Sequence, residues 1–262
     1  MNGILGKQRH QAGFSLVEIL VAMALGLVLL GGTIAIYASS KDSYRLQENI
    51  AGMQENARFA IHALRRDIEM AGFPQVLNVA PFLAAGDTPP GDIEVSADGD
   101  SDIVTVQFQS SPPPVAGALP IDRNCLGMQI PLGNPIINQY FVENGNLRCR
   151  SSTAGGATQT QTLVENVENL QVLYGIDEDG DNIANRYVTA TEVTDGVIDA
   201  GTPDWGRVVS LRLALLVASE NPIDADQRVG GFSLLDAAPI APEDDRLYRV
   251  FTTTIALRNR IP

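Results

Sequence analysis

Three aspartates at alternating positions are the clearest candidates for chemistry in this sequence. Asp177, Asp179 and Asp181 occupy positions one, three and five of an EF-hand-type loop, and Asn185 occupies position nine. Oxygen ligands at these positions converge on a hard cation. Calcium is therefore the one cofactor that the sequence suggests, and we expect no other.

The aspartate run departs from the calcium template at two positions. Asn182 stands at position six, where glycine is usual, and Val188 stands at position twelve in place of a bidentate glutamate. Aspartate, glycine and asparagine also favour turns, and a turn is expected after the apolar run Leu170–Ile176. The sequence leaves two alternatives open, a calcium site and an acidic, solvated turn.

Motifs for catalysis are missing from the sequence. It contains no G-x-S-x-G, no phosphate loop ending in Gly-Lys-Ser or Gly-Lys-Thr, and no H-E-x-x-H. The two cysteines and two histidines include no C-x-x-C pair and cannot by themselves make a zinc site. With 31 acidic residues, no single carboxylate pair stands out as an acid and base. We therefore predict that the protein is not an enzyme.

The composition is that of a globular protein with a strong acidic balance. The chain has 262 residues, 45% of them hydrophobic, which is enough for a sizeable core. Its formal net charge of -13 opposes binding to a phosphate backbone, so we expect no nucleic-acid partner.

The amino end carries a candidate membrane segment. Lys7 and Arg9 precede an apolar run from Phe14 to Tyr37 whose single formal charge is Glu18. A helix over this run spans roughly 36 Å at about 1.5 Å per residue, enough to cross a bilayer. The preceding positive charges predict a cytoplasmic amino end and a head outside the cytoplasm.

Gly13 and Glu18 distinguish this segment from an ordinary secretory signal and from a plain anchor. A secretory signal has a shorter apolar run followed by a small-residue cleavage site, whereas Gly13 precedes a long run. A charged residue in a membrane segment costs about 2.5–3.5 kcal/mol on insertion scales and usually marks a functional site with a partner. A plain anchor would leave Glu18 unexplained.

The run Gly13-Phe14-Ser15-Leu16-Val17-Glu18, behind a basic leader, resembles the type III signal of type IV prepilins. The resemblance implies that prepilin peptidase cuts between Gly13 and Phe14 and methylates the amino group of Phe14. It also implies a role in subunit assembly for Glu18. The protein would then sit in the bacterial inner membrane by a single span, with its head in the periplasm, before it enters a pilus.

The helical pattern continues well beyond the apolar run. No proline interrupts the chain from Phe14 to Phe73, and Gly72 followed by Pro74 supplies a stop. We predict one helix of about 55–60 residues with an amphipathic second half. The expected parts are a leader over 1–13, a transmembrane helix over 14–37, its continuation over 38–72 and a β-rich head over 73–262. The expected stripe comprises Leu46, Ile50, Met53, Ala57, Ile61, Leu64, Ile68 and Ala71.

The head shows the alternation and turn residues of β-structure. We predict a hairpin over Asn138–Arg150, with its turn at Asn144-Gly145. Further strands are expected at Asp102–Phe108, Leu170–Ile176, Val208–Val217 and Leu247–Leu257. The predicted fold class is therefore α+β and pilin-like, with one long amino-terminal helix packed on an antiparallel β-sheet head.

Cys125 and Cys149 are the two cysteines of the chain. In an exported domain an even pair favours one disulfide. Two buried free thiols are the alternative.

The sequence further resembles the PilW-type minor pilins in three stretches, Leu16–Gly32, Ser43–Phe73 and Trp205–Ser219. The resemblance implies a minor pilin that primes or tips a type IV pilus, with consequences for motility and cell adhesion. Its partners would be other minor pilins, the major pilin, prepilin peptidase and the inner-membrane assembly machinery. A pseudopilin of a type II secretion system and a pilus-borne adhesin or ligand-binding head are the alternatives.

Overall fold

The computed structural model describes residues 14–73, 101–112, 120–152, 157–198, 200–202, 204–222 and 230–259. The chain divides into two compact units, Met1–Glu48 and Asn49–Pro262. The predicted leader over 1–13 lies outside the described residues. The second unit includes the helix from Asn49 onward, whereas we expected from the sequence a head that begins at residue 73.

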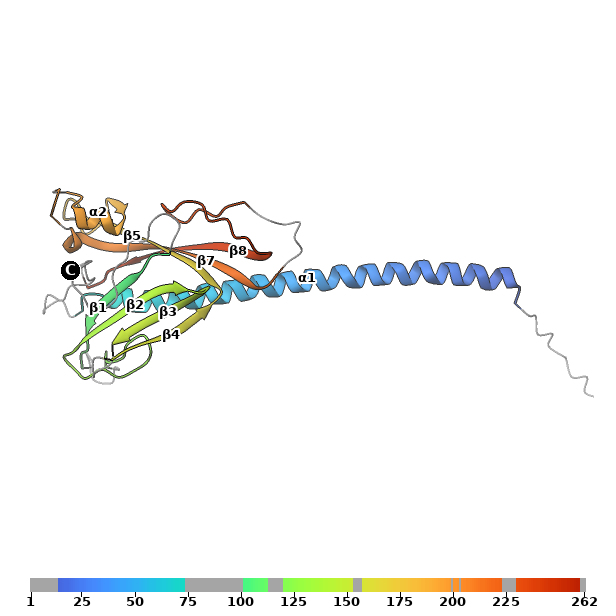
Figure 1. Ribbon diagram of the computed structural model, residues 1–262, viewed down its shortest axis with the longest axis horizontal. Helices are drawn as coiled ribbons and strands as arrows, with labels where there is room; N and C mark the ends of the chain where they lie inside the picture. The colour runs from blue at the N-terminus through green and yellow to red at the C-terminus, as the bar shows by residue number, and fades with distance from the viewer. Residues whose placement is uncertain are drawn as a thin grey trace, which may run out of the picture. The chain divides into compact units, whose positions relative to one another are not determined.

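A single α-helix, α1 (Leu16–Met70), accounts for 55 residues (Figure 1). The prediction of one uninterrupted helix is confirmed, because the chain has no proline there to remove a backbone donor. The helix ends where Gly72 takes a φ of 76°, a left-handed conformation that favours glycine. The amide of Gly72 then donates to the carbonyl of Gln107, which ties the helix end to the first strand.

The first of two β-sheets contains four antiparallel strands in the order β1-β2-β3-β4. The strands are β1 (Val104–Gln109), β2 (Pro135–Glu143), β3 (Asn146–Ser152) and β4 (Thr158–Glu165). Strands β2 and β3 form the predicted hairpin. Asn144 and Gly145 have φ of 52° and 69°, as a two-residue type I′ turn requires.

The second sheet is also antiparallel, in the order β6-β5-β7-β8. It consists of β5 (Val167–Ile176), β6 (Arg186–Val188), β7 (Val208–Pro222) and β8 (Arg246–Ala256). A short helix α2 (Ala190–Asp195), closed at its start by a capping box of Thr189 and Glu192, and a 3-10 turn, η2 (Trp205–Arg207), lie between β6 and β7.

The predicted antiparallel β-structure is confirmed, and the described residues of the head divide it into two sheets. The chain crosses from one to the other at Asn166, the single residue between β4 and β5, which has a φ of 59°. Asparagine tolerates this left-handed conformation better than most residues. Strand β4, with its Thr-Gln alternation, also escaped prediction, as did β6 and α2.

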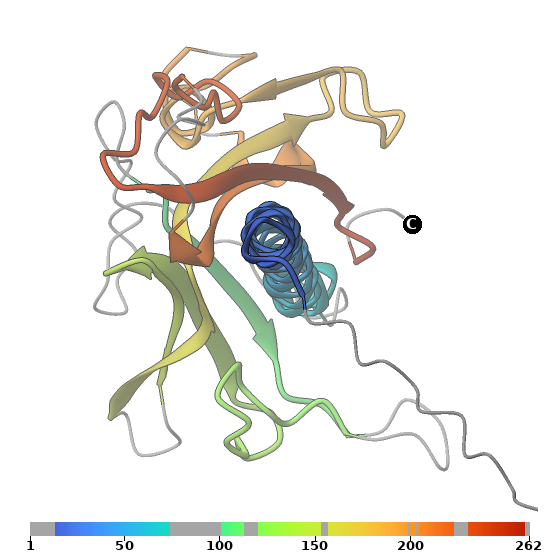
Figure 2. The ribbon, with the colours of Figure 1, turned by 90° about the vertical axis from the view of Figure 1, so that its right-hand side faces the viewer.

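The carboxyl part of α1 packs against both sheets, as the view along the helix shows (Figure 2). Most of the predicted apolar stripe is buried, but Ile50 is 38% exposed. Two polar residues, Asn49 and Asp67, are buried on the helix instead. The buried helix residues in the head are Asn49, Met53, Ala57, Ala60, Leu64, Asp67 and Ile68.

Candidate functional site

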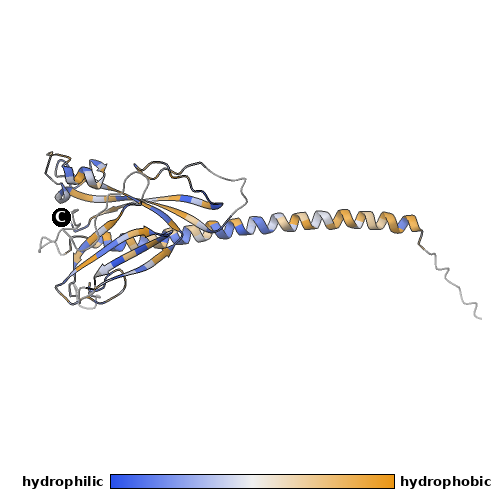
Figure 3. Ribbon diagram, viewed as in Figure 1, coloured by the Kyte–Doolittle hydropathy of each residue, from blue (hydrophilic) through white to orange (hydrophobic). Residues whose placement is uncertain are grey.

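The amino part of α1 is predominantly apolar (Figure 3) and has the length and composition of a membrane span. Its large apolar side chains are exposed, and none of the most apolar stretch is buried within the chain. Phe14 is exposed just before the helix, and Glu18 lies in the first helical turn. Gly13, the residue before the predicted cut, lies outside the described residues.

A buried polar cluster fixes α1 to the first sheet. The Asp67 carboxylate, 2% exposed, accepts hydrogen bonds from the Tyr140 hydroxyl and the Asn138 amide of β2, each 2.5 Å long. Its other oxygen accepts from the guanidinium of Arg66 at 3.0 Å. Burial and the neighbouring Asp67 charge raise the pKa of Tyr140 well above its usual value, so the hydroxyl remains a donor. The cluster therefore sets how the helix sits on β2.

A disulfide joins Cys125 to Cys149 in the structure, with Cα atoms 6.5 Å apart. Cys149 is fully buried on β3, and Cys125 belongs to the irregular segment before β2. The Asn138 side-chain oxygen accepts from the backbone amide of Cys125, beside the Asp67 cluster. The bond therefore holds this irregular segment onto the sheet that carries α1.

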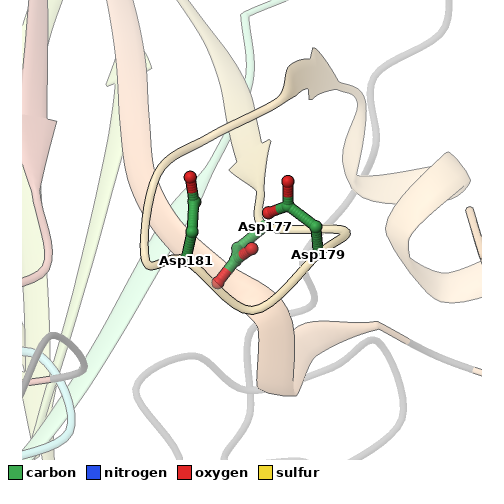
Figure 4. A group of neighbouring side chains, drawn as sticks. All are labelled: Asp177, Asp179 and Asp181. Atoms are coloured by element: carbon green, nitrogen blue, oxygen red, sulfur yellow. The ribbon is translucent and has the colours of Figure 1, made fainter.

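The aspartate run forms a loop between β5 and β6 (Figure 4). Asp177, Asp179 and Asp181 can bring one oxygen each to within 4.8 Å of one another. Asp177 is buried at the end of β5, whereas the other two are exposed. Three carboxylates are fewer than the six to eight oxygens that calcium takes, so backbone carbonyls or water would complete such a site.

Hydrogen bonds within the loop make it a well-defined turn. The Asp177 carboxylate accepts from the amides of Gly180 at 2.7 Å and Asn182 at 2.9 Å. Burial raises the pKa of Asp177, but the bonds from Asn182 and Gly180 outweigh it and leave the pKa below its usual value. Asn182 has a φ of 66°, so it supplies the left-handed conformation for which glycine is usual at position six.

Asn185 and Val188 serve the turn and the sheet. The Asn185 oxygen accepts from the amide of Glu178 at 2.6 Å, and its nitrogen contacts Asp179 at 3.4 Å. Val188 is buried in β6. The geometry thus brings the three aspartates together while the oxygen of Asn185 is used elsewhere. Calcium binding stays a prediction.

A pocket of about 530 Å³ lies near the β2–β3 turn. Its central cation, Arg246, already pairs with Glu168 at 2.7 Å and with Asp244 at 2.7 Å. Tyr248 donates to Asp244 at 2.8 Å, which closes the network. Because these charged groups satisfy one another, the pocket gives no specific support to a ligand-binding head.

Comparisons with known proteins match two parts of the chain. The model of the type IV pilus-assembly protein W matches residues 138–259. The model of the prokaryotic N-terminal methylation motif matches residues 8–34. No curated protein sequence matches the chain.

Two solved structures resemble the fold at low similarity. A type IV-like pilin from Thermus thermophilus is 17% identical with a TM-score of 0.43. The GspK-GspI-GspJ complex of the type 2 secretion system of enterotoxigenic Escherichia coli contains a chain that is 13% identical with a TM-score of 0.36. Each alignment covers 79% of this chain and 97% of the other. Scores this low carry no argument about function.

The methylation motif at the start of an apolar helix, followed by a β-rich head on that helix, defines a pilin: a non-enzymatic structural protein with prepilin-type membrane anchoring. Within that class, residues 138–259 are similar to the type IV pilus-assembly protein W, and the chain is a minor pilin of type IV pilus assembly. Its partners are accordingly the pilus machinery and other pilins.

Proposed function

We propose that this minor pilin joins other minor pilins and the major pilin in the bacterial inner membrane, where it primes a type IV pilus or forms part of its tip. The observation that carries the proposal is the position of Glu18 in the first turn of an exposed apolar helix. A carboxylate in lipid needs a partner, and assembly with another subunit supplies one.

Processing by prepilin peptidase comes first in the proposed sequence. The peptidase cuts after Gly13 and methylates Phe14, which removes the basic leader. The head is exported to the periplasm and then carried into the pilus. Amino-terminal sequencing of the membrane-extracted protein should begin at Phe14. A protein that still begins at Met1, or one cut beyond Tyr37, would refute this processing.

Deletion of the gene tests the role in assembly against its alternatives. We expect the deletion strain to lose surface pili and to regain them when the full chain is supplied in trans. Retained pili with lost attachment to surfaces would favour an adhesin. Lost secretion of exported proteins with normal pili would favour a pseudopilin of a type II secretion system.

A further inference from the structure

The outer edges of the two sheets are not equally protected. The edge of β1 is closed by the end of α1, where Gly72 donates to β1 and Phe73 accepts from it. The edge of β5 is closed by β6 and by Ser101 and Asp102, which bond to Leu170 at 2.7–3.3 Å. Strand β8 carries two charged residues near its start, Arg246 and Arg249, and charge discourages edge pairing.

Among the described residues strand β4 has a free outer edge, and its register with β3 shows which backbone groups point outward. In a two-residue hairpin the flanking residues, here Glu143 and Asn146, exchange both backbone hydrogen bonds. The odd-numbered residues of β3 therefore bond to β4, and Cys149 faces Gln161 there. It follows that the backbone groups of Gln159 and Gln161 point toward β3. Those of Thr158, Thr160 and Thr162 point outward.

The usual protective devices, here a register shift at Leu163 and the charged Glu165, lie only at the end of β4 and leave Thr158–Thr162 open. From Thr158 to Thr162 the strand is a Thr-Gln alternation without proline or charge. Four of these five residues are exposed, and Thr160 is half-buried beside Arg150. Among the residues that the structure describes, no strand pairs with the outer side of β4. Such an edge is a template for another strand.

We propose that the outer edge of β4 accepts an extended strand from a neighbouring pilus subunit, which would continue the first sheet across the subunit boundary. Main-chain hydrogen bonds would supply the affinity, as in other cases of strand addition. That the donor is a fellow subunit rests on the proposed function.

The side chains beside the edge indicate what the added strand carries. Arg150 lies opposite Thr160, and Arg148 lies opposite Thr162 on the same face of the sheet. Because Arg148 already pairs with Glu143, Arg150 is the cation that bears on the added strand. Residues on that face of the donor strand should therefore be acidic or neutral, and β-branched to pair with threonine. A donor strand with lysine or arginine on this face would be repelled.

A second copy of this chain fits the edge poorly. Two β4 strands paired antiparallel would be related by a two-fold axis perpendicular to the sheet. Because α1 packs on the face of this sheet, the same rotation would reverse the helix direction in the second copy. Subunits anchored in one membrane share a direction, so a different subunit is the fitting donor.

Hydrogen exchange measured by mass spectrometry tests the proposal on the full chain. Peptides covering residues 158–165 are compared between the chain alone in detergent and the chain in assembled pilus complexes. We expect exchange at Thr158, Thr160 and Thr162 to be about tenfold or more slower in the assembled state. Equal exchange in the two states would overturn the proposal.

A proline substitution supplies a second, independent test. In Thr160→Pro the outward donor is lost, while the ladder to β3 remains because the Thr160 amide does not bond to it. Thr160→Val is the matched control, since it keeps the backbone donor. An oxidised Cys125–Cys149 pair and a melting temperature near that of wild type would show that each variant folds. We expect Thr160→Pro to lose recruitment into the complex and Thr160→Val to keep it.

The two tests separate this proposal from the proposed function. If Thr160→Pro restores normal pili to the deletion strain with wild-type recruitment, the edge is not an assembly surface, although the role in pilus assembly stands. If the deletion strain has normal pili, the proposed function fails before the edge is considered. If the β4 amides are protected from exchange only in the purified chain without other subunits, the edge pairs with a second copy of the chain and the proposal is wrong.

Discussion

The carboxylate of Asp67 on α1 accepts a 2.5 Å hydrogen bond from the hydroxyl of Tyr140 on β2, and both side chains are buried. Asn138 on the same strand donates to the same oxygen. Because residues 138 and 140 share one face of β2, the single carboxylate spans two adjacent positions of that face. The contact thereby selects one register of the helix on the sheet, a task for which apolar packing alone is poorly suited.

Removing the carboxylate should destabilise the head. Asp67→Ala leaves the Tyr140 hydroxyl and the Asn138 amide buried without their acceptor, so we expect a loss of about 3 kcal/mol in the free energy of unfolding. Tyr140→Phe removes one donor and should cost about 1–2 kcal/mol. Urea denaturation of the detergent-solubilised chain measures both.

Exposed Glu55, on the same helix, provides the control. Glu55→Ala loses only a surface ion pair with Arg58, and its effect should stay under about 0.5 kcal/mol. An Asp67→Ala variant as stable as Glu55→Ala would show that the cluster does not hold the helix on the sheet.

Asp67 also marks a limit of prediction from sequence. The steps of three and four along the helix predicted which apolar residues meet the core, and Met53, Ala57, Leu64 and Ile68 are indeed buried. The apolar pattern does not predict a buried carboxylate, because burying a carboxylate without hydrogen-bond partners is unfavourable. Its partners lie some seventy residues away on β2, and only the tertiary fold brings them within reach.

The division of the strands between two sheets, and strand β4 of the first sheet, escaped prediction for a related reason. Alternation identified β7, since one face of that strand meets the core at every second residue. Strand β4 is polar on both faces over Thr158–Thr162, so it has no such alternation. The crossing at Asn166 depends on one residue in a left-handed conformation. The prepilin motif, by contrast, is a local run of residues, and the comparison with the methylation motif bears it out.

Asp102 should make the stability of the head depend on pH. Burial raises its pKa to about 6 from the usual 3.8, against a hydrogen bond from the Val172 amide that lowers it, and Asp236 raises it further. Because folding raises the pKa of Asp102, the protonated carboxyl stabilises the folded state. This contribution is complete below about pH 4 and is lost as the pH rises through about 6. We expect the free energy of unfolding to fall between these values by on the order of 1–3 kcal/mol.

Asp102→Asn keeps the acceptor for the Val172 amide and removes the titration. Its free energy of unfolding should change little over the same pH window and exceed that of wild type at pH 7. The carboxyls with lowered pKa, Asp177 and Asp244, lose their contribution only at lower pH and leave this window unaffected. Parallel pH profiles for wild type and Asp102→Asn would contradict the assignment.

The Cys125–Cys149 bond should contribute to stability and shield both thiols. The bond closes a sequence separation of 24 residues, for which chain-entropy models give roughly 3 kcal/mol. We expect the double variant Cys125→Ala with Cys149→Ala to lose about that amount in denaturant unfolding. Maleimide should not label unreduced, denatured protein but should label both cysteines after reduction. Labelling without reduction would reject the bond.

Chelation separates the two accounts of the aspartate loop. If Asp177, Asp179 and Asp181 bind calcium, a chelator should lower the melting temperature, and Asp179→Ala should remove that sensitivity. Asp177→Ala is the matched variant, because it loses two backbone hydrogen bonds and should lower the melting temperature with or without the ion. A melting curve unaffected by chelator leaves the acidic turn as the whole role of the loop.

The last prediction concerns Glu18. After a cut at Gly13, Phe14 would carry a positive amine four residues before Glu18, one helical turn away. Neither charge is well solvated in lipid or in a filament core, so each needs a partner. Pairing of Glu18 in one subunit with the amine of its neighbour would satisfy both charges and set the axial register of the two subunits. An intrachain pair, or a protonated Glu18 near the headgroups, is the competing account.

Glu18→Ala distinguishes these accounts because cleavage and assembly depend on different residues. The variant should still be cut, since the peptidase recognises Gly13, and its amino-terminal sequence should begin at Phe14. It should nevertheless fail to enter filaments or to recruit other minor pilins, and the deletion strain carrying it should lack pili. Glu18→Gln, which keeps the shape without the charge, should fail in the same way if charge pairing sets the register. Full complementation by Glu18→Ala, with normal pilus number, would show that Glu18 has no part in assembly.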